Sequence, residues 1–388
     1  MTYQPQDTET LSAVELVAQH GLEALPDALA ALINEAMRIE RERHLGAGHY
    51  ERSEQRNGYA NGYKPRTMNT RMGSLDLRVP QVRDGSFYPQ ALDKGLRSER
   101  ALKLAMAQMY VEGVSTRKVA RITEELCGFD VSSTEVSRCA KLLDEELGAW
   151  RERPLGAFPY VVLDARYEKV RHGGQVIDAA VLVALGVDEE GKREVLGVSV
   201  ELSEAEVHWR SFLNRLSARG LHGVKLFISD THAGLKAARA AVFPAVPWQR
   251  CQFHTQQNAG HYVPRKDQRK AVADAIRVIF NAPDIDDAKR MLDRFVKEWQ
   301  DKAPKLTAWA AQAIPECFAV FALPAHHRRR LRTSNVLERL NKELKRRTRV
   351  ATLFPNTDSC ERLVSAVAME ISEDWLTGRT YLNMDDTD

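Results

Sequence analysis

Three apolar, strand-like segments follow one another between residues 157 and 202, and they constrain the fold more than any other feature of the sequence. They read FPYVVLDARYEKV, QVIDAAVLVALGVD and REVLGVSVELS. The turns between them are short and contain Gly173-Gly174 and DEEGK, which are hairpin signals. Because parallel strands need a long crossover connection, three strands joined in this way should be antiparallel.

Helical and strand-like segments alternate after this meander. EAEVHWRSFLNRLSARGL and AGLKAARAAV have the periodicity of amphipathic helices, whereas VKLFISD and VPWQRCQF are typical of strands. The predicted order is therefore β-β-β-α-β-α-β, in which helical crossovers add two parallel strands to the antiparallel three. This is the ribonuclease-H-like (RNase H-like) arrangement, and the fold class that we predict is α/β.

The rest of the chain predicts several further segments, because 388 residues exceed one ordinary hydrophobic core. The patterns indicate an N-terminal helical region over 1–50 and a small strand-and-turn module over 51–98. A helix-turn-helix domain is expected over 99–152. The α/β core should occupy 153–255 and 329–388, the latter with a C-terminal helix, and an all-helical insertion should fill 256–328.

The segment expected to form the helix-turn-helix contains two helical patterns around the turn CGFDV. In the first, GVSTRKVARITEEL, the apolar positions are Val119, Ile122 and Leu126. The second begins at Ser132 with Glu135 three residues later, which is a capping box, and is expected to run over 133–147. A plain helical hairpin fits the pattern as well. If the segment binds DNA, its candidate contacts are Arg117, Lys118 and Arg138.

The positive charge of the chain is concentrated near its C-terminal end. The net charge is only +3, yet residues 326–349 hold ten Arg and Lys against two Glu, a local charge of +8. Such a block is either a solvated face or the footprint of a nucleic acid. The candidate phosphate contacts in it are Arg328, Arg329, Arg330, Arg332, Arg346 and Arg347.

Other features of composition favour a cytoplasmic protein. No apolar run approaches the length of about 20 residues that a membrane helix needs. The first residues, MTYQPQDTET, lack the basic and apolar regions of a secretory signal. The five cysteines are scattered and odd in number, so a disulfide framework is not expected.

Two of the strand-like segments carry an isolated aspartate. Asp164 lies among the apolar residues of the first strand, and Asp230 ends the fourth. The predicted topology places these strands side by side, where two carboxylates repel each other unless a cation lies between them. Mg²⁺ prefers such oxygen ligands together with substrate phosphates. A helix cap or turn is the alternative role for Asp230.

A third acidic ligand should come from a helix that packs near these strand ends. Glu338 and Glu343 in SNVLERLNKELKRR are the candidates. Glu338 could instead form a relaxed capping box with Asn335, and Glu343 fits better as an ion-pair partner of Arg339, Arg346 or Arg347. Cys251 and His254 have the spacing of half a zinc site, but no second pair follows, so we interpret them as structural groups near the metal site.

Taken together, these motifs resemble those of bacterial transposases of the Mutator-type (IS256) family. The matching stretches include VVLDARYEKVR, LFISDTHAGLKAA, PWQRCQFHTQQN and LRTSNVLERLNKELKRRTRV, in that order, and the N-terminal RNGY, NGY and GVSTRKVA segments match as well. The resemblance implies a DDE transposase of a mobile element whose three acids are Asp164, Asp230 and Glu338. The family's Cys-x-x-His feature falls on Cys251 and His254.

The resemblance also implies cofactors and partners. Two Mg²⁺ or Mn²⁺ ions per active site are expected, and the partners would be terminal inverted repeats, target DNA and a second copy of the chain. A catalytically inactive DNA-binding regulator and an RNase H-like nuclease remain alternatives. The sequence specifies neither the repeats nor the target preference.

Overall fold

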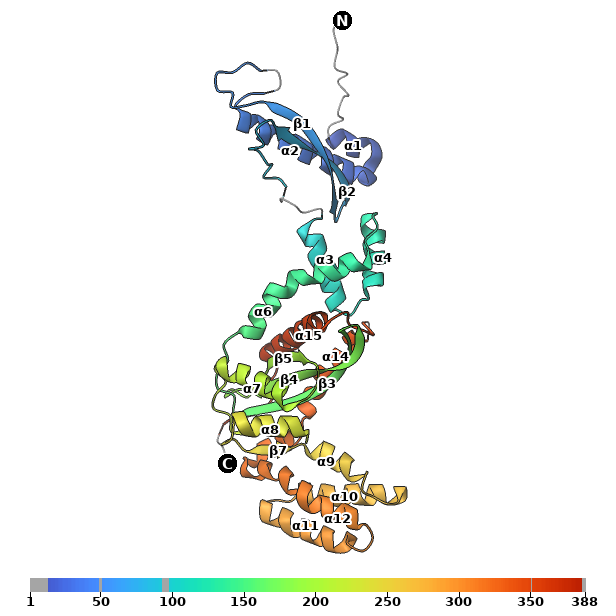
Figure 1. Cartoon of the computed structure of the whole chain (residues 1–388), viewed down its shortest axis with the longest axis vertical. Coiled ribbons are helices and arrows are strands. Elements are labelled where there is room, and N and C mark those ends of the chain that lie inside the picture. The colour runs from blue at the N-terminus through green and yellow to red at the C-terminus, as the bar shows by residue number, and fades with distance from the viewer. Residues whose placement is uncertain (1–12, 49–50, 93–97, 350, 386–388) are drawn as a thin grey trace. The chain divides into compact units, whose positions relative to one another are not determined.

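The computed structural model describes residues 13–48, 51–92, 98–349 and 351–385 (Figure 1). The chain divides into two compact units, Met1–Leu142 and Leu143–Asp388. The stretch that was examined for a secretory signal, residues 1–10, lies outside the described residues. The observed architecture is a mixture of helices and sheets, which confirms the α/β part of the prediction.

The first unit combines helices with a two-stranded antiparallel sheet. Its helices are α1 (Ala13–His20), α2 (Leu25–Leu45), α3 (Arg100–Val111), α4 (Thr116–Cys127) and α5 (Ser133–Cys139), and its strands are β1 (Ala60–Thr70) and β2 (Gly73–Val82). Strand β2 alternates between buried and exposed side chains along most of its length. Its buried face, with Leu75, Leu77 and Val79, packs against Met37 of α2.

Strand β1 differs from β2 because most of its side chains are exposed. Among its eleven residues only Thr70, the last, is buried. The register between the strands shifts between Ala60 and Tyr63, which marks a bulge or irregularity at the beginning of the ribbon. In the part of the chain that the structure describes, β1 pairs with no strand other than β2.

The predicted second helix over 133–147 is wrong as a single element. Ser132 does cap a helix, since its hydroxyl accepts a hydrogen bond of 3.1 Å from the Glu135 amide. However, α5 ends at Cys139, a 3-10 turn spans Ala140–Leu143, and a new helix, α6 (Asp144–Glu152), begins. The first turn of α6 consists of acidic residues, which favour a helix N-terminus. The boundary between the two units lies inside this break.

The second unit is built on a five-stranded sheet in the order β5-β4-β3-β6-β7. Its strands are β3 (Tyr160–His172), β4 (Gln175–Val187), β5 (Arg193–Glu201), β6 (Leu226–Ser229) and β7 (Trp248–Arg250). The first three are antiparallel, and β6 and β7 are parallel to β3. Helices α7 (Glu206–Ala218) and α8 (Ala233–Val242) form the crossovers, so the element order expected from the sequence is observed.

Helices cover both faces of this sheet (Figure 1). Trp209, Phe212 and Leu213 of α7 and Leu235 of α8 form one hydrophobic core with alternate residues of β3 and β4. Helix α15 (Thr357–Thr377) packs on β5 and β3, and α14 (Glu338–Thr348) packs against α15. Gly186 permits close packing of β4, because a Cβ there would lie only 2.4 Å from the ring of Phe158.

Between β7 and α14 the described chain is helical. The elements are α9 (Gln252–Ala259), α10 (Arg269–Phe280), α11 (Ile285–Trp299), α12 (Pro304–Ala313) and α13 (Ala325–Leu331), with short 3-10 turns. Ala288, Leu292, Phe295 and Trp299 form the buried stripe of α11. None of the helices in the described part of the chain is long and apolar enough to cross a membrane.

Candidate active site

Asp164 and Asp230 occupy matching positions on two neighbouring parallel strands. Strand β3 pairs with β6 in a register that places Val162 opposite Ile228. Each aspartate lies two residues further along its strand direction, so the two are brought to the same point at the sheet centre. Adjacent strands are about 4.8 Å apart, which is close enough for the two carboxylates to repel each other.

The alternation of side chains shows which face the aspartates share. Val161, Leu163 and Phe227 point into the core beneath α7 and α8. Because successive side chains in a strand point to opposite faces, Asp164 and Asp230 lie on the other face. Both side chains are partly buried.

Helix α14 reaches this face through two hydrogen bonds to β3. The Nδ2 amide of Asn341 donates to Oδ2 of Asp164 at 2.9 Å, and the Arg166 guanidinium donates to the Asn341 carbonyl oxygen at 2.8 Å. Arg166 also pairs with Glu168, which accepts a hydrogen bond from Thr348 at the end of the same helix. These contacts hold β3 and α14 together, through Asn341 in the first half of the helix and through Thr348 at its end.

The electrostatic environment favours the protonated form of Asp164. Burial is the largest cause and raises the pKa of its carboxyl group to about 6, and the negative charge of Asp230 acts in the same direction. The hydrogen bond from Asn341 and the charge of His254 oppose this rise. A carboxyl group with these neighbours would be stabilised as an anion by a cation bound beside it.

Glu338, the predicted third acid, is the first residue of α14, and its side chain is exposed. Its spacing of three residues from Asn341 places both on one face of the helix, and the turn Asn335–Leu337 before it contacts β3. The capping-box alternative is not observed, because no side chain caps this helix. Within the described residues, no group of three or more His, Cys, Asp or Glu side chains is already arranged to hold a metal ion.

Glu343 lies one helical turn further along and forms an ion pair with Arg346 at 2.9 Å. This confirms the ion-pair role expected for it from the sequence. Its side chain is held on the helix surface by this interaction.

Cys251 lies between the sheet and the segment that leads into α14. Its amide donates to the Ser229 carbonyl oxygen at 2.7 Å, and its buried Sγ accepts hydrogen bonds from the amide and hydroxyl of Ser334. Burial alone would raise the pKa of the thiol, but interactions with His254 and Ser334 outweigh it and lower the pKa.

His254 connects Cys251 to the aspartates. The interaction with the Cys251 thiol raises the pKa of His254, burial opposes the rise, and the charges of Asp164 and Asp230 add to it. The Nδ1 atom of His254 is buried without a hydrogen-bond partner. His254 therefore lies close enough to both aspartates to feel their charge. The interpretation of the pair as structural groups near a metal site stays a prediction.

Two groups at this site were not identified from the sequence. Asn341 is one of them, and the only signal for it is its position three residues after Glu338. The other is Glu204, whose carboxylate approaches Nδ1 of His232 to 3.4 Å. Burial raises the pKa of Tyr167, and a hydrogen bond with Glu204 and the charges of Glu204 and Asp230 add to the effect. Glu204 is the first residue of the predicted helix EAEVHWRSFLNRLSARGL, and nothing in that pattern marks it for this site.

The cations proposed as phosphate contacts differ in how accessible they are. Arg329, Arg330 and Arg346 are exposed, although Arg330 donates to the Tyr381 carbonyl oxygen. Arg328 and Arg332 are partly buried and donate to Pro283 and Asn281. Arg117, Lys118 and Arg138 of the first unit are exposed.

Arg347 requires a correction. Its side chain is only 4% exposed and forms two hydrogen bonds of 2.6 Å to the carboxylate of Glu370. The hydrophobic stripe of α14, with Leu340 and Leu344, points into the protein, and Arg347 lies on that side. We therefore withdraw it from the set of predicted DNA contacts and assign it to the packing of α14 on α15.

Comparison with known proteins gives a consistent result along nearly the whole chain. The sequence model of a family described as "Transposase, Mutator family" matches residues 2–378. The transposase for insertion sequence element IS406 of Burkholderia multivorans is 56% identical, with 96% of each chain covered. That for ISRM5 of Rhizobium meliloti is 44% identical, covering 97% of this chain and 94% of its own. That for IS256 in transposon Tn4001 of Staphylococcus aureus is 37% identical, with 92% of each covered.

Proposed function

Since the chain belongs to the Mutator family of transposases, we propose that it is a DDE transposase that moves an insertion sequence. It would bind the terminal inverted repeats, cleave DNA strands at the element ends and transfer those ends to target DNA. The observation that carries this proposal is the matched position of Asp164 and Asp230 on neighbouring parallel strands, on the face where Asn341 contacts Asp164.

The two aspartates fit a divalent cation by their chemistry. Both are oxygen ligands and they share one face. Burial, with a smaller contribution from the charge of Asp230, raises the pKa of Asp164, and a bound cation would offset both effects. Hard cations such as Mg²⁺ and Mn²⁺ prefer ligands of this kind. Asp164 and Asp230 would hold two such ions, and Glu338 would supply a further carboxylate.

When bound, these ions would activate the attacking hydroxyl and stabilise the leaving oxygen of the phosphodiester. The side chains of the protein would set the geometry around them. Asn341 holds Oδ2 of Asp164, while Arg166 and Ser334 fix α14 at either side of the site.

The order of the chemistry follows from the substrates. Water would attack first and free a 3′-hydroxyl at the element end, and this hydroxyl would then attack the target strand. No covalent bond to the protein is needed. The exposed arginines, among them Arg329 and Arg346, would hold the DNA phosphates. Because an element has two ends, we expect at least two copies of the chain on DNA.

The strand order of the second unit supports an RNase H-like interpretation of its core. Three antiparallel strands followed by two parallel ones, with helices on both faces, are what that fold requires. In this interpretation α9 to α13 form the helical insertion. We also propose that α4 and α5 form the helix-turn-helix that contacts DNA.

The test is a cleavage and joining assay with the purified full chain. The substrates are labelled duplexes carrying the ends of its own element, with Mg²⁺ or Mn²⁺, and a supercoiled target plasmid. We expect metal-dependent nicking at the ends and joined products, both lost in Asp164→Asn. Binding without nicking would instead indicate an inactive regulator, and nicking without joining would indicate a nuclease.

A further inference from the structure

The first unit contains a repeated tripeptide, Asn57-Gly58-Tyr59 and Asn61-Gly62-Tyr63, whose role the proposed chemistry does not explain. Both glycines have positive φ, +115° at Gly58 and +71° at Gly62, a conformation that side chains rarely adopt. Gly58 lies in a bend before β1, whereas Gly62 lies inside β1, and each glycine is followed by a tyrosine. Gly62 belongs to the irregular beginning of β1, where the register with β2 shifts.

Both tyrosines are exposed and carry guanidinium groups over their rings. Tyr59 is 59% exposed, with the guanidinium carbon of Arg83 at 5.4 Å and that of Arg56 at 5.7 Å from the ring centre. Tyr63 is 48% exposed and receives a hydrogen bond of 3.0 Å from Arg41. A cation over an aromatic ring is an ordinary stabilising contact, and here it holds the guanidinium groups of Arg56 and Arg83 beside the ring of Tyr59.

The segment around Gly58 and Gly62 is basic. Residues 51–83 contain seven Arg and Lys against three Glu and Asp, so their net charge of +4 exceeds the +3 of the whole chain. The side chains of Arg52, Lys64 and Arg83 are exposed and form no ion pair with any other described residue. By contrast, Arg277, Lys289 and Arg290 of the helical segment each pair with an aspartate on their own helix.

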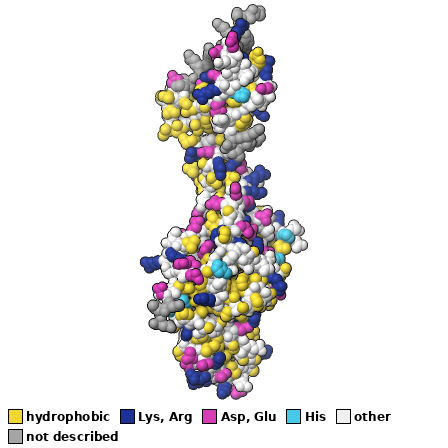
Figure 2. Space-filling view, turned by 90° about the vertical axis from the view of Figure 1, so that its left-hand side faces the viewer, with side chains coloured by type: hydrophobic (Ala, Val, Ile, Leu, Met, Phe, Trp, Pro, Cys, Tyr) yellow, Lys and Arg dark blue, Asp and Glu magenta, His cyan; other side chains and the backbone are white. Residues whose placement is uncertain are grey.

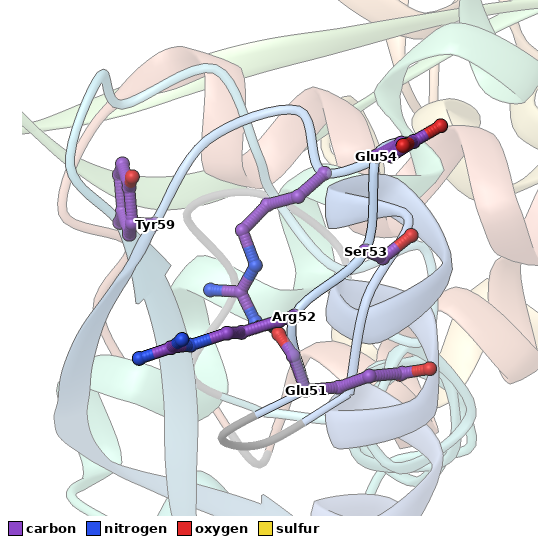
Figure 3. Close-up of a pocket in the computed structure, with 6 residues that line it drawn as sticks. Glu51, Arg52, Ser53, Glu54 and Tyr59 are labelled. Atoms are coloured by element: carbon purple, nitrogen blue, oxygen red, sulfur yellow. Dashed lines mark hydrogen bonds between the residues drawn. The ribbon is translucent and has the colours of Figure 1, made fainter.

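A shallow hollow opens beside Tyr59 and is lined by Glu51, Arg52, Ser53, Glu54 and Arg56 (Figure 3). Tyr59 lies on one side of it, and Ser53 and Glu54 lie on the other. The Glu51 carboxylate already accepts a hydrogen bond of 2.7 Å from the Gly48 amide. The hollow combines the guanidinium groups of Arg52 and Arg56 with the carboxylates of Glu51 and Glu54. An anionic ligand would therefore meet the arginines beside the ring of Tyr59 and not the whole hollow.

We propose that this N-G-Y surface, defined by Arg52, Arg56, Tyr59, Lys64 and Arg83, binds the phosphate backbone of duplex DNA. The choice of DNA rests on the proposed function. The geometry of the first unit also supports DNA, because an antiparallel two-stranded ribbon such as β1–β2 fits into the DNA major groove. The arginines and Lys64 would hold phosphates on the flank of that groove, and the tyrosine ring would keep two guanidiniums in place.

The alternatives predict a different surface. The buried core of a subunit contact is more apolar than the rest of the surface and depleted of charged residues. The N-G-Y surface instead consists of four cations around the single ring of Tyr59. In the view of Figure 2, acidic and basic side chains intermix within each of the two units, among the residues that the figure colours. A local contact of a few phosphates fits this distribution better than a long electrostatic track.

The test uses the full chain and a labelled duplex of arbitrary sequence, with binding measured over a range of salt concentrations. Lys64→Gln combined with Arg83→Gln should reduce the slope of log affinity against log salt by about 1.8, since each phosphate contact contributes about 0.9. Tyr59→Leu should weaken binding about 2- to 5-fold, the usual magnitude of a cation–π contact, and Tyr59→Phe should retain it. Arg277→Gln is the control for loss of one exposed charge.

The outcomes of this test can be distinguished from failure of the proposed catalytic chemistry. A double variant with the wild-type salt slope and an intact circular dichroism spectrum overturns it. The proposal is also overturned if the double variant changes the oligomeric state in light scattering but binds DNA normally. The same holds if it binds duplex RNA more weakly but duplex DNA as well as the wild type does. Asp164→Asn should keep the wild-type slope, and cleavage by that variant would refute the proposed chemistry while leaving the N-G-Y surface supported.

Discussion

The side-chain amide of Asn341 donates a 2.9 Å hydrogen bond to one carboxylate oxygen of Asp164, across 177 positions of sequence. This contact joins the first strand of the large sheet to α14, the helix that begins at Glu338. A carboxylate held at one oxygen has fewer orientations left for the other, so it is preorganised to bind a ligand on its free side. Asn341 is thus a positioning residue for Asp164.

Replacing Asn341 by Ala should weaken Mn²⁺ binding about 10- to 100-fold, the usual cost of removing a group that orients a ligand. Titration calorimetry measures this directly, without DNA. Asn341→Ser, which keeps a short donor, should recover part of the affinity. Lys342→Ala, at an exposed neighbouring position, is the control. If Asn341→Ala binds Mn²⁺ as tightly as this control does, Asn341 does not position Asp164.

The three acids should be separately essential for cleavage. Asp164→Asn, Asp230→Asn and Glu338→Gln each remove a charge that would hold the ions, so we expect nicking at the element ends to fall at least about 1000-fold. DNA binding in a mobility-shift assay should not change.

Glu343→Gln is the matched control for Glu338→Gln, because both acids lie on α14 and Glu343 pairs with Arg346. It should keep most of its nicking activity. If Glu343→Gln is inactive and Glu338→Gln is active, the third acid has been assigned to the wrong turn of the helix.

The raised pKa of Asp164 predicts how stability depends on pH in the absence of metal. An unfolded Asp titrates near about 3.9, whereas burial and the charge of Asp230 raise the folded pKa to about 6. Between these values the folded state binds more protons than the unfolded state, so the free energy of unfolding falls as pH rises through this window.

The loss should reach about 2–3 kcal/mol above pH about 6, since one pKa unit corresponds to about 1.4 kcal/mol. Asp164→Asn cannot ionise and should lack this loss, so in chelator it should be more stable than wild type at neutral pH and similar at pH about 4. Denaturant melts at the two pH values measure the difference. A constant difference across the range would mean that the Asp164 carboxyl group is not perturbed by folding.

The core of the second unit could be predicted from the sequence because its signals are local. Apolar runs interrupted by Gly-rich turns specify a meander, and an aspartate inside an apolar strand is conspicuous. Individual helices were less well predicted. In α4 the buried positions are Val119, Thr123 and Cys127, whereas Leu126 is 75% exposed, since the helix packs on one side with a four-residue spacing.

Contacts between distant segments could not be predicted in the same way. His327 belongs to the basic stretch 326–349, yet its side chain is buried between the Tyr160 hydroxyl at 2.9 Å and the Asn383 carbonyl oxygen at 2.6 Å. Arg347 was grouped with its exposed neighbour for the same reason. A run of cations shows net charge, but which members point inward depends on the helix face that the rest of the fold covers.

This distinction gives the last prediction, which compares Arg347 with Arg346. Arg347→Met removes two charge-assisted hydrogen bonds to Glu370 from a buried position, so the free energy of unfolding should fall by about 2–3 kcal/mol. Arg346→Met removes an exposed pair with Glu343 and should change it by no more than about 0.5 kcal/mol. Denaturant melts measure both. Equal losses would mean that the Arg347–Glu370 pair does not anchor α14 to α15, and a stable Arg347→Met variant that binds DNA more weakly would return Arg347 to the phosphate contacts.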